Sequence, residues 1–216
     1  MIQILIIIIF TILLLLIYIY NSRINYEQKY KNRIFSSKYN HEFKSGDIIF
    51  MNYPYGAPFI NYAVDSYFQH VGIVVRYNDE LYILETGIDG AFYLNSPDGI
   101  NMNKIPDIFK RNNNDYYVLS INKELDYDRN NKILEILKSN YSYPNYSNLL
   151  LNYLINNNNP ENDKHCFDLL AIILNEINFV NIIDKPIDEK AYIIEHLHKI
   201  NLSDDYKYDL VKKLIS

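Results

Sequence analysis

The segment Ser66–Gly87 reads SYFQHVGIVVRYNDELYILETG, and its pattern predicts a β-hairpin. Val, Ile, Leu and Tyr, which favour strands, dominate Tyr67–Tyr77 and Glu80–Thr86. The residues between them, Asn78-Asp79, are a common turn pair. The segment therefore predicts two antiparallel strands, around which the rest of the chain can be placed.

The register of this hairpin brings His70 and Glu85 together. With a two-residue turn, Tyr77 faces Glu80, and Gly72 then lies opposite Glu85. Since side chains alternate between the faces of a strand, His70 shares a face with Gly72 and is a diagonal neighbour of Glu85. A four-residue turn keeps the pair on one face, whereas a three-residue turn separates it. A carboxylate beside an imidazole holds one tautomer and favours the protonated ring.

The one cysteine, Cys166, is the candidate nucleophile. The pattern predicts a helix over Asp163–Asn178, which puts Cys166 in the first turn, where the positive helix end stabilises a thiolate. Leu170, Ile173 and Ile177 share its face at helical spacing, so this face is expected to pack on the sheet. A nucleophilic cysteine needs such a lowered pKa, a facing base and nearby backbone N–H groups.

Each of these residues also has an ordinary structural explanation. A lone cysteine is usually a small buried hydrophobe, and a lone histidine on a strand usually has its hydrogen bonds satisfied. Glu85 alone would be a solvated strand residue. The combination of a same-face His/Glu pair with a cysteine at a helix N-terminus favours catalysis.

The composition describes one folded domain behind an apolar N-terminal stretch. The chain has 216 residues, 49% of them hydrophobic and 15% aromatic. Its net charge of −5 argues against nucleic acid as the main partner. The single cysteine excludes an intramolecular disulfide.

The N-terminal stretch, Ile2–Tyr20, predicts a single transmembrane anchor (residues 1–20). It is nearly all apolar and close to the ~20 residues that a spanning helix needs. A cleaved signal peptide is the alternative, but the basic n-region and small-residue cleavage site are missing. Residues 21–42 are expected to form a basic linker or stem. Because positive charges flank a membrane span on its cytosolic side, the sequence predicts a single-pass membrane protein with its folded domain on the cytosolic, reducing side.

The remaining pattern predicts an α+β fold with a small antiparallel sheet packed against helices. The folded domain begins near Phe43, and Gly87–Pro106 is expected to be rich in loops. Further strands are expected at Ile48–Asn52 and Tyr116–Ile121, and helices at Asp128–Ser139, Ser147–Ile155, Asp163–Asn178, Asp188–Ile200 and Asp204–Ile215.

Four motifs in this order resemble the circularly permuted papain-fold hydrolases of the NlpC-like superfamily, and within it the YiiX group, which has poxvirus members. The motifs are GDIIF (Gly46–Phe50), FQHVGIVV (Phe68–Val75), LYILET (Leu81–Thr86) and HCFDLLAIIL (His165–Leu174). The resemblance covers about Phe43 to Phe179 and implies a permuted papain-like hydrolase domain over residues 43–216.

The resemblance also implies roles for the site residues. It makes Cys166 the nucleophile, His70 the general base and acid, and Glu85 the residue that orients His70. The implied activity is that of a membrane-anchored cysteine peptidase or amidase acting through an acyl-thioester, with no cofactor. Phe167 departs from the Ser or Glu that often follows the cysteine in the family. Tyr53 and Tyr55 are further candidates to line the site.

Three alternatives stay open at this point. One is a lipid acyltransferase or phospholipase using the same site on a lipid acyl substrate. Another is a catalytically inactive structural protein, such as a virion membrane protein. The third is a metal site built from His165, Cys166, His70 and His41. It is disfavoured because adjacent helix residues point about 100° apart.

Overall fold

The structure, a computed structural model, describes residues 9–14, 17, 35–36, 41–52, 66–86, 100–105, 115–136 and 166–214. Residues 9–14 are helical. No helix within the described residues is long and apolar enough to cross a membrane. Most of the predicted anchor and stem, the predicted helix Ser147–Ile155, and Tyr53 and Tyr55 lie outside the described residues.

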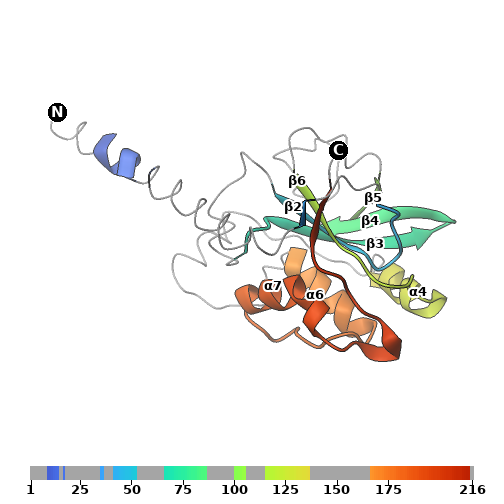
Figure 1. Cartoon of the computed structure of the whole chain (residues 1–216). Helices are drawn as coiled ribbons and strands as arrows, with labels where there is room; N and C mark the ends of the chain where they lie inside the picture. The colour runs from blue at the N-terminus through green and yellow to red at the C-terminus, as the bar shows by residue number, and fades with distance from the viewer. Residues whose placement is uncertain are drawn as a thin grey trace.

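The described part of the chain builds one seven-stranded sheet with strand order β1-β7-β6-β2-β3-β4-β5 (Figure 1). Every neighbouring pair is antiparallel except β1–β7, which is parallel. The α+β class and the antiparallel sheet predicted from the sequence are therefore confirmed. The strands are β1 (Phe35–Ser36), β2 (Ile48–Asn52), β3 (His70–Tyr77), β4 (Glu80–Thr86), β5 (Ile100–Lys104), β6 (Asp115–Leu119) and β7 (Lys212–Leu214).

The β3–β4 hairpin has the predicted register. Tyr77 pairs with Glu80 and Gly72 with Glu85. The turn residues Asn78 and Asp79 have φ of 48° and 64°. Positive φ at both central positions suits the right-handed twist of the flanking strands, and Asn and Asp tolerate it better than most residues.

The helices that follow β6 lie on one side of the sheet (Figure 1). Three of them agree in position with predicted helices, although the third ends earlier than expected. A salt bridge of 2.6 Å between Lys190 Nζ and Asp168 Oδ1 joins two of these helices. The helical elements are α4 (Tyr127–Ile136), α6 (Cys166–Glu176), α7 (Ile187–Glu195) and the short 3₁₀ turns η1 (Leu197–Lys199) and η2 (Ser203–Asp205).

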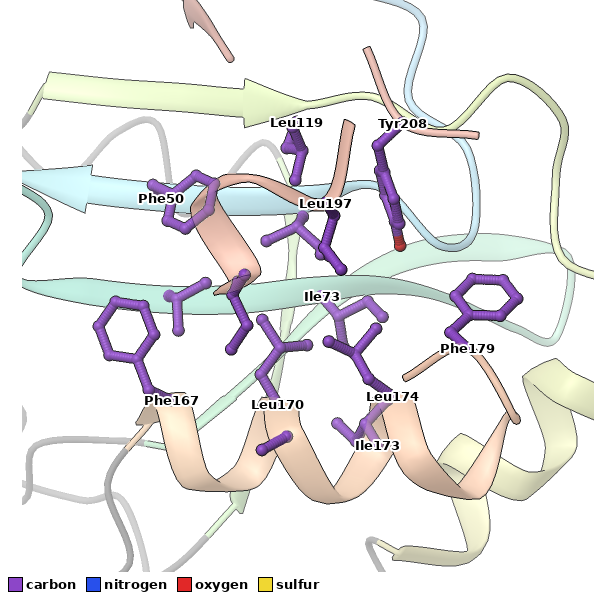
Figure 2. Close-up of a cluster of buried hydrophobic side chains, with 14 of the residues drawn as sticks. Phe50, Ile73, Leu119, Phe167, Leu170, Ile173, Leu174, Phe179, Leu197 and Tyr208 are labelled. Carbon is purple, nitrogen blue, oxygen red and sulfur yellow. The ribbon is translucent and has the colours of Figure 1, made fainter. Parts of the chain in front are cut away.

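The main core fills the space between α6 and the sheet (Figure 2). Leu170 and Leu174 of α6 point toward β2 and β3, where Phe50 and Ile73 face them, and Ile173 belongs to the same core (Figure 2). All five side chains are buried. The predicted inward face of this helix is thus confirmed, and the packing fixes the helix that begins at Cys166.

The predicted helix Asp204–Ile215 is wrong. Asp204 and Asp205 have φ of 55° and 59°, a left-handed conformation that cannot continue an α-helix. Beyond them Tyr206 and Tyr208 are both buried, at the spacing of an extended chain. The last described residues of the chain form β7, which pairs with β6. Pairing with the sheet edge therefore overrides the helical pattern, and the C-terminal part is not wholly helical.

Two strands arise where the sequence predicted none. β5 falls in Gly87–Pro106, the segment expected to be rich in loops, and β1 in the expected stem. The β5 segment reads INMNK, and its two asparagines disfavour strands in isolation. Pairing with β4 determines its conformation instead.

Candidate active site

His70, Glu85 and Cys166 each lie at or near the end of a secondary-structure element. His70 is the first residue of β3, Cys166 is the first residue of α6, and Glu85 is the last residue but one of β4. All three are buried, with exposed fractions of 4%, 3% and 5% for His70, Glu85 and Cys166. The structure brings these three predicted residues together.

The predicted diagonal contact forms directly. His70 Nε2 lies 2.9 Å from Glu85 Oε2, within hydrogen-bonding distance. A carboxylate can only accept, so Nε2 carries the proton and donates it. A buried carboxylate with this partner holds the imidazole in one tautomer and one orientation.

His70 also shares a side-chain hydrogen bond with Cys166. Burial alone would lower the pKa of His70. The negative charge of the Cys166 thiolate and its hydrogen bond, followed by the hydrogen bond and charge of Glu85, outweigh burial and raise the pKa of His70 from 6.5 to about 10. At neutral pH the His70 ring is therefore an imidazolium.

His70 and Glu85 lie on the sheet face opposite α6. Alternation puts His70 on the same face as Val74, which belongs to a second apolar cluster with Ile83. Val71, on the other face, belongs to the core beneath α6. Cys166 and His70 are each the first residue of their element, so they can meet beyond the end of the strand. Periodicity alone did not reveal this arrangement, because it says nothing of which face a distant helix covers.

No protein-family model and no curated protein matches the sequence. Among solved structures, the chain is similar to one described as the metalloprotein YiiX from Escherichia coli O157:H7. The TM-score is 0.41 and the identity 15%, over 80% of this chain and 88% of that chain.

Sequence reasoning missed one residue beside the site. Asn103 of β5 donates a hydrogen bond of 2.9 Å from Nδ2 to Glu85 Oε1. Its segment carries no alternating strand pattern, because two asparagines interrupt it. Only the β4–β5 register reveals the contact. Asn103 pairs with Ile83, two residues before Glu85, and so lies on the same face as Glu85.

The metal alternative finds no support in the described residues. Those residues contain no group of three or more His, Cys, Asp or Glu side chains placed to hold a metal ion. His165 lies outside them. His41 instead contacts Asp47, with Nε2 2.7 Å from Oδ2.

Proposed function

We propose that this protein is a cysteine hydrolase of the permuted papain-like kind, with Cys166 as nucleophile, His70 as acid and base, and Glu85 as the orienting residue. One observation carries the proposal: a buried histidine contacts a carboxylate on one side and the only cysteine on the other. A structural cysteine needs neither a charged ring nor an orienting acid.

The arrangement supports a thiolate–imidazolium pair that exists before substrate arrives. Nε2 of His70 is engaged by Glu85, which leaves Nδ1 for the sulfur of Cys166. The thiolate attacks a substrate carbonyl carbon, and the π electrons move to the carbonyl oxygen. As the tetrahedral species collapses, the bond to the leaving group breaks, and the leaving group takes the proton of His70.

Deacylation follows the same path in reverse. A water molecule gives a proton to the now neutral His70 while its oxygen attacks the thioester carbonyl. Collapse of the second tetrahedral species breaks the C–S bond, releases the acid and restores the thiolate and the imidazolium. Atoms and charges balance without a cofactor.

The start of α6 supplies the electrostatic part of the mechanism. The first backbone N–H groups of a helix have no partner within the helix. An oxyanion that forms on a carbonyl attacked by the sulfur of Cys166 would lie at this end of the helix, where its charge is stabilised.

An amide or peptide is the proposed substrate class, and a lipid ester is the competing one. The two predict different covalent intermediates on Cys166. Intact-mass analysis after rapid acid quenching of a reaction with cell extract identifies the bound acyl group. A peptidyl or amino-acyl mass supports the peptidase assignment, whereas a fatty-acyl mass supports the lipid acyltransferase or phospholipase.

Reaction of the purified full-length chain with iodoacetamide tests the site itself. We expect Cys166 to be alkylated near neutral pH much faster than the same thiol in urea-unfolded protein, and His70→Ala to remove that advantage. His198→Ala, a histidine of η1 outside the site, is the matched control and should react like wild type. An equal rate in folded and unfolded protein would contradict the proposal and favour an inactive structural protein.

A further inference from the structure

Glu85 has two oxygens, and both are engaged within the sheet. His70 contacts Oε2, and the amide nitrogen of Asn103 donates to Oε1, each at 2.9 Å. Because a carboxylate accepts only, the nitrogen of Asn103, not its oxygen, must face it. The carboxylate is thus fixed between one cationic and one neutral donor.

The register explains why Asn103 reaches Glu85. Asn103 lies opposite Ile83, so it shares the face of Ile83 and Glu85 and is diagonal to Glu85 across the β4–β5 pair. The His70–Glu85 contact is also diagonal, across β3–β4. Three strands therefore place three polar side chains in a continuous line on one face, and the line ends at Cys166.

Burial makes the second donor necessary. Glu85 is 3% exposed, so water cannot readily take the place of a missing partner. Without Asn103 the carboxylate would lose the hydrogen bond to Oε1 in a buried setting, and its terminal torsion would be less constrained. Both changes weaken its hold on the His70 ring.

We propose that Asn103 is a positioning residue, the fourth member of a relay in which Asn103 holds Glu85, Glu85 holds His70, and His70 holds the Cys166 thiolate. This proposal rests on the proposed hydrolase function. It goes further by assigning a role to a strand that no catalytic motif in the sequence marked.

The test is the pH dependence of iodoacetamide alkylation of Cys166 in the full chain. Asn103→Ala is expected to raise the midpoint of that profile by about half a pH unit, a roughly threefold loss of rate below the midpoint. Glu85→Gln is expected to raise it by about one unit. Asn103→Gln, which keeps an amide donor, should recover part of the shift.

A double variant distinguishes an effect of Asn103 that acts through Glu85 from a general disturbance of the local structure. If Asn103 acts through Glu85, Asn103→Ala adds no further shift to Glu85→Gln. Lys104→Ala is the matched control on the same strand. Its exposed side chain pairs with Glu80 on the other face, so the alkylation midpoint should stay that of wild type. Asn103→Ser, whose short hydroxyl does not span the gap, repeats the test if Asn103→Ala does not fold.

The outcomes distinguish the two proposals. If wild type itself reacts with an ordinary thiol midpoint near ~8.5, the hydrolase proposal fails, and the relay fails with it. If wild type reacts at low pH and His70→Ala and Glu85→Gln shift the midpoint, but Asn103→Ala and Asn103→Ser do not, only the role of Asn103 is refuted. An additive shift in the double variant refutes it as well.

Discussion

Gly72 lies directly opposite Glu85 in the β3–β4 pair, and it has no room for a side chain. A Cβ at Gly72 would stand 2.7 Å from Ile83 Cγ2, 2.9 Å from the Leu84 carbonyl oxygen and 3.2 Å from Glu85 Cβ. One of these neighbours is backbone, so the strands themselves would have to move. From the sequence alone, Gly72→Val, which keeps the strand pattern, is expected to harm activity more than folding. The contact with the Leu84 backbone adds a cost to folding.

Gly72→Ala is therefore expected to reduce both stability and thiol reactivity. Overpacking of this kind typically costs about 1–3 kcal/mol, and the displaced Glu85 would lose its contact with His70. Urea unfolding measures the first effect and alkylation of Cys166 the second. Val74→Ala on the same strand face is the control. It should cost a similar free energy of unfolding but leave the alkylation rate of folded protein unchanged.

The pKa of His70 predicts a pH window for stability. In the folded protein His70 keeps its proton up to about pH 10, whereas an unfolded histidine loses it near 6.5. The folded state binds that proton more tightly, so the stabilisation is fully present below about pH 6.5 and is lost as the pH rises toward 10. NMR titration of the His70 ring should show the raised pKa, and Cys166→Ser should lower it by removing the largest favourable contribution.

Packing beneath α6 should carry a large share of the stability of the fold. Ile173 is fully buried against the sheet, and its truncation leaves a cavity. We expect Ile173→Ala to cost about 2–5 kcal/mol of unfolding free energy in chemical denaturation. Ile172→Ala, one position along and only partly buried, should cost clearly less. Equal costs would mean that α6 does not pack as described.

Asp47 is expected to be a structural carboxylate. It is fully buried, and Oδ1 accepts hydrogen bonds from Ser120 Oγ at 3.1 Å and Ile121 N at 2.9 Å, while Oδ2 accepts from Lys44 N at 3.0 Å. Asp47→Asn puts a donor where acceptors are needed and should cost roughly 1–3 kcal/mol. Asp209→Asn, in an exposed ion pair, should change stability by under ~1 kcal/mol. Neither should alter the alkylation rate of folded protein.

Membrane attachment remains a prediction from the apolar run Ile2–Tyr20. We expect the full chain to stay in the membrane pellet after alkaline carbonate extraction, and a variant without residues 1–20 to be released. Release of the full chain would contradict the anchor.

Local patterns predicted the hairpin and its His70–Glu85 contact because turn chemistry and alternation decide both. Asn78-Asp79 sets the register, and the register alone places His70 beside Glu85. The same reasoning placed Cys166 at a helix start. Local patterns did not predict β5 or β7. These segments are strands because each pairs with a neighbouring strand, β5 with β4 and β7 with β6. Asn103 lies on β5, so the sequence pattern did not mark it as a site residue either.

The segment leading to His70 is tied to a distant helix. Ser66 Oγ accepts a hydrogen bond from Phe68 N at 2.9 Å and donates one to the Glu195 carboxylate of α7. Proteins emerge from the ribosome N-terminus first, so His70, Glu85 and Cys166 are all synthesised before Glu195. A nascent chain thus holds every reactive group before the hydrogen bond between Ser66 and Glu195 can form. A chain truncated after residue 186 should show the alkylation rate of an unfolded thiol, which would delay any hydrolytic activity until synthesis has passed α7.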